Sequence, residues 1–271
     1  MVTYKPIYPQ AKLALLGGGI SHSLSPFIHK YWLDKYGLVG GYDLLHKESL
    51  SESDLKNLSD SGFVGLNVTM PFKKDVLSFL DHKDDLVEKV GAANTLLFQD
   101  GLLRGTNTDA TAFKRLIEPY LPLKTAVVLG GGGASLATLW ALDQVGVKDM
   151  RVVVRQKNIS FPARIYPWSQ VNEASDGCDV FINATPLGMA GKPEQISLPP
   201  LPPRCLVVDW VYYPQKTTLL SQAERAFHPT LDGIDLLLAQ AQDAFYFWFG
   251  IHPEITSELR QGLREVHQPG L

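Results

Sequence analysis

Apolar and polar positions alternate between two patterns along this chain. Short apolar runs, which are typical of strands, occupy residues 13–16, 42–46, 63–68, 95–98, 125–129, 151–155, 179–182 and 206–210. Segments with apolar residues at helical spacing begin near Pro26, Ser51, Pro71, Asp109, Ala134 and Thr217, and two more cover residues 235–249 and 253–266. This alternation of strands and helices predicts an α/β protein with mainly parallel sheets.

Turn signals divide the pattern into parts. Gln99-Asp100-Gly101 lies between two apolar runs and predicts a local hairpin. A proline-punctuated stretch at 119–123 separates a helix from a glycine-rich strand–turn–helix, and residues 231–233 mark a second seam. We therefore expect one compact unit between the two seams, with the terminal helices packed elsewhere.

Composition and charge narrow the class of protein. The chain has 271 residues, 45% of them hydrophobic and 20% charged, which is enough for one large or two modest folded domains. Its net charge of −3, with no basic run, gives no reason to expect a nucleic-acid partner or an anionic membrane. The longest apolar stretch, 234–251, is interrupted by acids and amides and predicts an amphipathic core helix, not a membrane span. Because the N-terminus has no apolar signal core, we expect a cytoplasmic protein.

Cysteine and histidine give weak signals. Cys178 and Cys205 are too few for a disulfide framework and are expected to be small buried residues in a reducing compartment. No cluster of His, Cys, Asp and Glu has metal-site spacing, so no metal is predicted. His22 lies in a serine-rich segment, whereas the other histidines, His29 among them, are expected at the surface or at helix ends. The aromatic run 245–249 predicts core packing of the closing helix.

A glycine-rich turn follows the buried-strand pattern at 125–129. Gly130, Gly131, Gly132, Gly133 and Ala134 come directly after the strand, and a helix-period run begins there. Glycines at such a turn let backbone N–H groups approach a pyrophosphate at the helix N-terminus. Ser135 replaces the third glycine of the usual pattern and is small enough for close helix–strand packing. A purely structural turn is the alternative, but the strand–turn–helix context favours dinucleotide binding.

The end of the next strand indicates which dinucleotide is used. An acid there would hold a ribose 2′-hydroxyl, whereas an arginine accommodates a 2′-phosphate. The segment Arg155-Gln156-Lys157-Asn158 contains two cations and no acid. We therefore expect NADP (NADPH) to be favoured over NAD as the cofactor.

Three polar clusters lie where strands of the N-terminal half end. Ser23 and Ser25 open a helix with Pro26 and are either helix caps or ligands of a substrate carboxylate. Asn67, Thr69 and Lys73 follow the third strand, and Lys73 is either a solvated lysine or a general acid/base.

The third cluster contains Asn94 and the segment Asn107-Thr108-Asp109. Asp109 is either a catalytic carboxylate or the cap of the following helix. Each residue of the three clusters has an ordinary structural explanation when it is considered alone.

The order of these segments resembles the shikimate dehydrogenase family. Ser-x-Ser-Pro, Asn-Val-Thr-x-Pro-x-Lys, Gly-Ala-Ala-Asn-Thr, Asn-Thr-Asp and Gly-x-Gly-Gly-Ala-Ser occur here in the family's order. The same order continues with Asn-Ala-Thr-x-x-Gly-Met at 183–189, Asp-x-x-Tyr at 209–212, Asp-Gly at 232–233, and Gln240. The resemblance covers nearly the whole chain.

The resemblance implies an N-terminal α/β substrate domain, residues 1–108 plus 234–271, and a Rossmann-like doubly wound NADP-binding domain, residues 109–233, with the C-terminal helices returning to the substrate domain. The active site would lie in the cleft between the domains. Lys73 and Asp109 match the catalytic pair, and Ser23 and Ser25 match the serines that hold the shikimate carboxylate. The other matched substrate positions are Asn67, Thr69, Asn94, Tyr212 and Gln240. The matched cofactor positions are Gly130, Gly131, Gly132, Gly133, Ala134, Arg155, Thr185 and Gly233.

The implied activity is the reversible NADPH-dependent reduction of 3-dehydroshikimate to shikimate. Two alternatives stay open: a quinate/shikimate dehydrogenase using NAD or NADP, and a non-catalytic shikimate-binding paralogue. The choice between monomer and homodimer is also open. Two departures from the family are visible: no second Arg follows Arg155, and Asp235 stands where the family usually has a glycine. The short, proline-containing stretch 158–176 predicts that the helix usually found there is shortened or lost.

Overall fold

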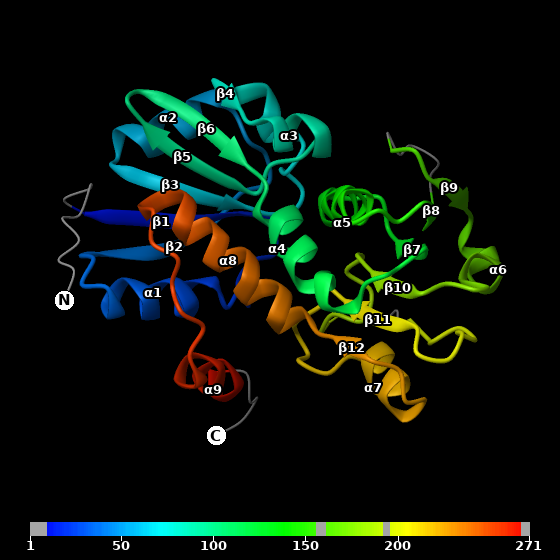
Figure 1. The fold of residues 1–271 in the computed structure, drawn as a ribbon. Coiled ribbons are helices and arrows are strands. Elements are labelled where there is room, and N and C mark those ends of the chain that lie inside the picture. Colours follow the sequence, from blue (N-terminus) through cyan, green and yellow to red (C-terminus); the bar gives the residue numbers. More distant parts are fainter. Residues whose placement is uncertain (1–9, 156–160, 192–195, 267–271) are drawn as a thin grey trace. The chain divides into compact units, whose positions relative to one another are not determined.

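The computed structural model describes residues 10–155, 161–191 and 196–266 (Figure 1). Contacts divide the chain into two compact units. Unit 1 comprises Met1–Thr108 and Gln240–Leu271, and unit 2 comprises Asp109–Ala239. The chain thus returns to unit 1 inside helix α8 (Gly233–Phe249), a little later than the residue 234 expected from the sequence.

Unit 1 is built on a six-stranded mixed sheet in the order β2-β1-β3-β5-β6-β4. The strands are β1 (Ala11–Gly17), β2 (Gly40–His46), β3 (Phe63–Val68), β4 (His82–Lys83), β5 (Thr95–Gln99) and β6 (Leu102–Thr106). β1 pairs with β2 and β3 in parallel, and β5 runs antiparallel to both β3 and β6. The predicted hairpin is confirmed, because Asp100 and Gly101 join β5 to β6 with positive φ angles of 55° and 75°.

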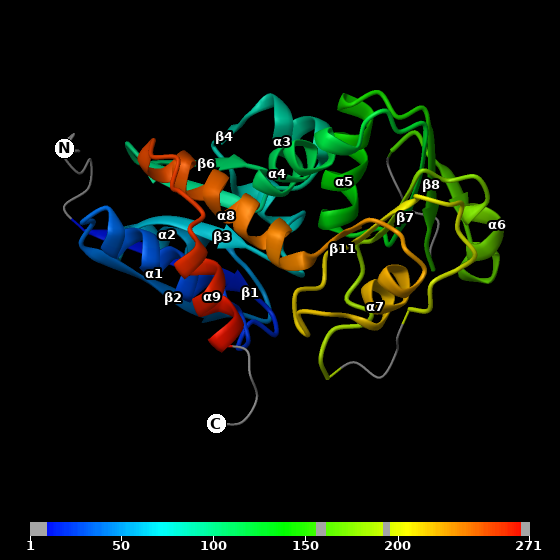
Figure 2. The ribbon, with the colours of Figure 1, turned by 60° about the horizontal axis from the view of Figure 1, so that its bottom comes forward.

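Helices cover both faces of this sheet. They are α1 (Ser25–Lys35), α2 (Glu52–Asp60), α3 (Asp85–Val90), the C-terminal part of α8 and α9 (Ser257–Val266). α2 begins with a capping box between Ser51 and Asp54, as expected for a helix starting near Ser51. On one face, α2 and α3 pack against Leu16 and Leu66. On the other face, Trp248 of α8 lies over Gly65, where any side chain would overlap the indole. α9 packs beside α1 (Figure 2).

Unit 2 has a fully parallel six-stranded sheet in the order β12-β11-β10-β7-β8-β9. The strands are β7 (Thr125–Leu129), β8 (Asp149–Val153), β9 (Arg164–Tyr166), β10 (Val180–Asn183), β11 (Leu206–Asp209) and β12 (Thr230–Leu231). The helices are α4 (Thr108–Ile117), α5 (Gly133–Gln144), α6 (Val171–Ser175) and α7 (Thr218–Arg225). Counted from β7, this is the 3-2-1-4-5-6 order of a Rossmann fold read from the other edge. The predicted fold class is confirmed.

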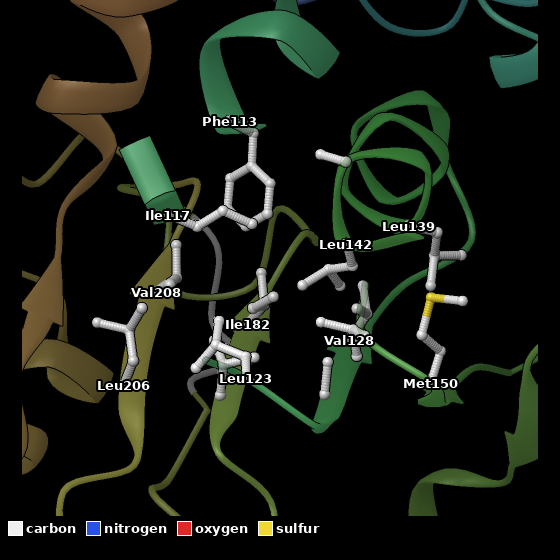
Figure 3. Close-up of a cluster of buried hydrophobic side chains, with 14 of the residues drawn as sticks. Phe113, Ile117, Leu123, Val128, Leu139, Leu142, Met150, Ile182, Leu206 and Val208 are labelled. Atoms are coloured by element: carbon white, nitrogen blue, oxygen red, sulfur yellow. The ribbon is translucent and has the colours of Figure 1, made fainter. Parts of the chain in front are cut away.

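Two apolar clusters, one on each face, make the core of unit 2. Figure 3 shows the first, in which Phe113 and Ile117 of α4 and Leu142 of α5 lie over the sheet near Ile182, and Leu139 of α5 lies beside Met150. Strands buried on both faces need continuous apolar runs, which is why β7, β10 and β11 were visible in the sequence. The second cluster contains Cys178 and Cys205, which are buried as predicted, with a hydrogen bond between their sulfur atoms (3.5 Å) and no disulfide.

Several boundary predictions need correction. No α-helix begins near Pro71: a turn leads into a 3₁₀ helix at Asp75–Phe79. The physical reason is that the Lys73 carbonyl accepts from the backbone N–H of Ala93 (2.8 Å), instead of from a later residue of its own segment. The last helix begins at Ser257, not at Pro253.

The segment after β8 also differs in part from expectation. The strand ends at Val153, so Arg155 follows it as an exposed residue, and Lys157 lies outside the described residues. The shortened helix expected within 158–176 is confirmed in the part of that stretch that the structure describes, where α6 has 5 residues.

His29 was wrongly expected at the surface or a helix end. Its exposed fraction is 0%, and its ring stacks on Tyr42 with centroids 4.5 Å apart and lies 5.2 Å from that of Trp248. Burial lowers the pKa of His29 to about 3 and outweighs the opposing effect of Asn67, so the imidazole is neutral at physiological pH.

Candidate active site

Polar segments of unit 1 meet at one edge of its sheet. β1 and β3 are parallel neighbours with Leu16 opposite Val68, so the segments that follow them leave the sheet side by side. β5 runs the other way and begins at this same edge, with Thr95 opposite both Asn67 and Thr106. The topology therefore brings together the predicted segments 23–25, 67–73 and 94–95 and the start of the predicted segment 107–109, which are distant in sequence.

The turn after β1 packs directly on the turn after β3. The Gly18 N–H donates to the Met70 carbonyl (2.8 Å), and the Thr69 N–H donates to the Leu16 carbonyl (2.9 Å). A side chain at Gly17 would overlap the Thr69 methyl group, so this close approach requires glycine. These contacts hold partly exposed Thr69 beside the segment that leads to Ser23 and Ser25.

The serine segment differs from the capping arrangement that was the alternative explanation. α1 begins at Ser25 itself, Leu24 occupies the capping position, and no side chain of the described residues makes the capping hydrogen bond there. The Ser23 hydroxyl instead accepts from the Ser25 N–H (3.2 Å). Ser25 is buried and Ser23 is partly exposed, at the N-terminus of an 11-residue helix.

Asn67 is buried and held at both ends of its amide. Its Nδ2 donates to the Thr95 hydroxyl (3.0 Å) and to the Asn94 carbonyl (3.3 Å). Its Oδ1 accepts from the Tyr42 hydroxyl (2.8 Å). Tyr42 was not among the predicted site residues, and the only sequence signal for it is that a buried tyrosine hydroxyl needs a partner.

Asn94 fixes the start of helix α4. Its Oδ1 accepts from the Thr108 N–H (2.7 Å) and its Nδ2 donates to the Thr108 hydroxyl (3.0 Å). Asp109 follows directly as the second residue of α4 and is 4% exposed. The capping alternative for Asp109 is therefore wrong, because α4 has already begun at Thr108.

The backbone of Lys73 is bonded to residues 92–94, a strip that includes Asn94. The Lys73 carbonyl accepts from Ala93, the residue before Asn94, while its side chain is partly exposed. Gly91 ends α3 in the left-handed conformation (φ 69°) and turns the chain toward this strip. Residues 92–94 therefore position both the backbone of Lys73 and the residue that precedes Asp109.

In unit 2, the glycine-rich turn leaves the central strand β7 and opens α5. Gly130 has a φ angle of 108°, and its N–H donates to the Val153 carbonyl (2.9 Å). Ser135 is buried and donates back to the Gly130 carbonyl (2.7 Å), so it closes the turn in place of the third glycine. A Cβ on exposed Gly132 would meet nothing within 4 Å, and no side chain of the described residues caps α5. The first N–H groups of this helix therefore form a cradle suited to a pyrophosphate.

Thr185 lies beside this turn, after β10. Its methyl carbon is 2.9 Å from the place where a Cβ of Gly130 would stand, and the Ala184 N–H donates to Leu129 (3.0 Å). β10 and β7 are the neighbours at which the strand order reverses, and ligands of open parallel sheets bind at this point.

The remaining predicted residues divide between the units. Tyr212 follows β11 in unit 2, whereas Gln240, 9% exposed on α8, belongs to unit 1 with the other substrate candidates. Gly233 begins α8, where any side chain would overlap the Val211 backbone, so its glycine has a packing reason. Asp235 fits a regular first helical turn, where its N–H donates to the Asp232 carboxylate (2.9 Å).

The described residues contain neither a candidate metal site nor a candidate membrane span. Within residues 10–155, 161–191 and 196–266, no group of three or more His, Cys, Asp or Glu side chains is placed to hold a metal ion. None of the helices described there is long and apolar enough to cross a membrane.

Comparison with known proteins agrees with this arrangement. Residues 15–96 match the family described as shikimate dehydrogenase substrate binding domain. A Cereibacter sphaeroides protein named shikimate dehydrogenase (NADP(+)) is 37% identical over 265 residues, which cover 91% of this chain and 94% of that protein.

Solved structures agree as well. Shikimate 5-dehydrogenase from Thermus thermophilus, in complex with NADP(H) and shikimate, matches with a TM-score of 0.81 and 31% identity over 94% of this chain and 99% of that one. Quinate dehydrogenase from Corynebacterium glutamicum, in complex with NAD, matches with a TM-score of 0.86 and 28% identity over the same shares.

The fold and the two polar edges define a two-unit α/β protein with a Rossmann-type nucleotide fold. Identity at this level over nearly the whole chain goes further than a shared fold. The chain belongs to the shikimate dehydrogenase family.

Proposed function

We propose that this protein is an NADP-dependent shikimate dehydrogenase that reversibly reduces 3-dehydroshikimate to shikimate. The observation that carries the proposal is the strip 92–94, which holds the Lys73 backbone through Ala93 and the residue before Asp109 through Asn94. Both members of the family's catalytic pair are retained, and residues 92–94 bond the backbone of Lys73 and of Thr108, the residue before Asp109. A protein that only bound the ligand would need the pocket but no proton donor.

Unit 1 supplies the substrate groups in this proposal. Ser23 and Ser25 stand at the N-terminus of α1, where hydroxyls and the helix dipole favour a carboxylate. Asn67, Thr69, Asn94 and Gln240 provide the amides and hydroxyls that a polyhydroxylated ring requires. Tyr212 is assigned as a further substrate residue, contributed by unit 2.

Unit 2 supplies the cofactor groups. The turn 130–134 fits a pyrophosphate, because the space beside Gly132 is open and no side chain of the described residues caps α5. Arg155, exposed just after β8, is assigned to the 2′-phosphate, and Thr185 and Gly233 to the nicotinamide side. When bound, NADPH supplies the hydride.

Lys73 and Asp109 carry the proton chemistry. In the reductive direction, the Lys73 ammonium donates a proton to the substrate oxygen on which negative charge develops, and in the oxidative direction the amine takes it back. The Asp109 carboxylate is assigned to orienting the Lys73 ammonium. No bound metal is needed if an ammonium fills this role.

A second candidate is a quinate dehydrogenase that uses NAD. It is favoured by the likeness to the quinate dehydrogenase structure with NAD, whose TM-score is 0.86. The absence of an acid in 151–155, the described residues at the end of β8, speaks against it, because NAD sites use a carboxylate for the ribose hydroxyls.

The test is the shikimate-dependent reduction of NADP, followed by the absorbance of the reduced nicotinamide. The proposal predicts turnover with a kcat of roughly 1–1000 per second, the usual range for enzymes. Shikimate binding measured by calorimetry without any turnover would instead support the ligand-binding paralogue. The reverse reaction with 3-dehydroshikimate and NADPH serves as the second arm.

A further inference from the structure

Asp209 is a fully buried carboxylate at the end of β11 that has no part in the proton chemistry proposed above. Its exposed fraction is 0%, and its partners come from three separate segments. Oδ1 accepts from the Asn183 amide (2.8 Å) and from the Val211 N–H (3.0 Å). Oδ2 accepts from the Thr217 hydroxyl (2.7 Å). One carboxylate therefore joins the end of β10 and the segment after β11 to the start of α7.

These three partners all donate, which is what an ionised carboxylate requires. Burial raises the pKa of Asp209 to about 6, and the hydrogen bonds from Thr217, Val211 and Asn183 oppose that rise. Burial of a charged carboxylate is unfavourable by itself. The presence of Asp209 at this position therefore needs an explanation other than packing.

The two carboxylate oxygens of Asp209 bond different parts of unit 2. Oδ2 bonds the Thr217 hydroxyl, which in turn accepts from the Leu220 N–H and caps α7. Oδ1 serves the loops after β10 and β11. The side of the carboxylate that stabilises a helix is thus separate from the side that faces the predicted cofactor loop.

Asp209 orients the Asn183 amide, and the Asn183 amide in turn bonds Thr185. The Asn183 Nδ2 donates both to Asp209 and to the Leu187 carbonyl (3.0 Å), so its Oδ1 points the other way. That oxygen accepts from the Thr185 N–H (3.0 Å) and the Thr185 hydroxyl (2.6 Å). A rotated Asn183 amide would present its NH₂ group to the Thr185 N–H, and the Asp209 carboxylate opposes this rotation together with the Leu187 carbonyl.

We propose that Asp209 is a positioning residue for NADP binding, acting through Asn183 to hold Thr185 and the loop 183–187 against the glycine-rich turn. The inference rests on the proposed function of unit 2 as the cofactor unit. Thr185 lies against Gly130 at the point where the strand order reverses, so the position of this loop shapes one wall of the expected cofactor site. The dissociation constant for NADP is the quantity that the relay controls.

The test compares four variants of the full chain by calorimetric titration with NADP and, separately, with shikimate, together with the melting temperature. Asn183→Ala breaks the relay and leaves the carboxylate in place. Asp209→Ala removes the bonds of both oxygens, whereas Asp209→Asn keeps one oxygen able to accept from Asn183 and Val211. Thr217→Val is the matched control, because it removes only the bond to Oδ2 and the helix cap.

Asn183→Ala is expected to raise the Kd for NADP by about tenfold, the worth of a hydrogen bond to a charged group, with the Kd for shikimate within about twofold of wild type. Asp209→Asn should retain more NADP affinity than Asp209→Ala. Thr217→Val should melt at a lower temperature and bind NADP as wild type does.

An unchanged Kd for NADP in Asn183→Ala would overturn the relay, as would an equal loss of affinity in Thr217→Val, which would indicate general loosening of unit 2. If Asp209→Ala does not fold, comparison of Asn183→Ala with Thr217→Val still shows whether Asn183 controls the Kd for NADP. Failure of wild type to bind NADP would refute the proposed function instead, so the two failures are distinguishable.

Discussion

The two predicted binding regions, the polar edge of the unit 1 sheet and the glycine-rich turn at the edge of the unit 2 sheet, are built in different ways. In unit 1, the edge consists of buried side chains whose amides and hydroxyls bond one another, with Asn67 and Asn94 at 5% and 2% exposure. In unit 2, the edge is a backbone turn with an open helix N-terminus, and the assigned arginine is exposed. On the proposed assignment, preset side chains discriminate between similar ring substituents, whereas backbone donors bind any pyrophosphate and leave the choice between NADP and NAD to Arg155. Substitutions in unit 1 should therefore change the kinetic constants for shikimate, and substitutions in unit 2 should change those for NADP.

Catalysis gives the largest expected effect. Lys73→Ala should lower kcat by roughly 10²–10⁴-fold, the usual contribution of a positioned acid or base, with NADP binding retained. Asp109→Asn should also lower kcat. The matched control is Lys74→Ala, since Lys74 is the exposed neighbour and has no assigned role. Steady-state kinetics check the prediction, and normal turnover in Lys73→Ala would return that residue to an ordinary surface lysine.

His29 and Asp209 should contribute to the pH dependence of stability with opposite signs. His29 in unit 1 has its pKa lowered to about 3, so the unfolded chain binds more protons between about pH 6.5 and 3, and stability is lost as pH falls through that range. Asp209 in unit 2 has its pKa raised to about 6, so its contribution falls as pH rises from about 4 to 6.

At pH 5, His29 should cost unit 1 about 2 kcal/mol relative to pH 7 or above, from the interval of roughly 1.5 pH units below its unfolded pKa. Urea unfolding of wild type and His29→Phe at pH 7 and pH 5 measures this, and comparison of the two pH changes cancels the packing cost of the variant. Exposed His82→Gln is the control and should keep the wild-type pH dependence. A His29→Phe protein as acid-sensitive as wild type would show that the acid response has another source.

Cofactor choice gives a smaller effect, confined to unit 2. Arg155→Ala should erode kcat/KM with NADP by about tenfold or more, about 1.4 kcal/mol, and change the value with NAD far less. High salt should weaken NADP use selectively, because the contact is exposed and screened. Equal losses with both cofactors would mean that Arg155 serves the fold and not the 2′-phosphate.

The buried network of unit 1 gives the smallest effect. Tyr42→Phe removes the donor to the Asn67 Oδ1 and should raise KM for shikimate by roughly tenfold or less, about 1 kcal/mol, with KM for NADP unchanged. Tyr36→Phe is the control, since that hydroxyl accepts from Glu254 outside the network (3.3 Å). A rise in the KM for both shikimate and NADP, or for neither, would contradict the assignment of shikimate binding to unit 1 and NADP binding to unit 2.

Some of this organisation was readable in the sequence. The strands β7, β10 and β11 of unit 2 are buried and therefore appear as apolar runs, and the glycine-rich turn follows β7 directly. His29 was misplaced although a signal existed: it lies on the same helical stripe as Ile28, Trp32 and Leu33, all buried.

Other features depend on contacts between distant residues and leave no local pattern. Tyr42 meets Asn67 only because β1 brings β2 and β3 to its two sides. The turn at Pro71 departs from a helix because the Lys73 carbonyl bonds Ala93 across the fold. The roles of Asn183 and Asp209 were hidden for the same reason, since each is defined by a partner on a neighbouring strand.

The central claim is that unit 1 selects shikimate and unit 2 selects NADP. The most direct test is kcat/KM of the wild-type enzyme in the four pairings of shikimate or quinate with NADP or NAD. We expect the highest value for shikimate with NADP, at least about tenfold above shikimate with NAD, a difference of about 1.4 kcal/mol. A highest value for quinate with NAD would contradict the account.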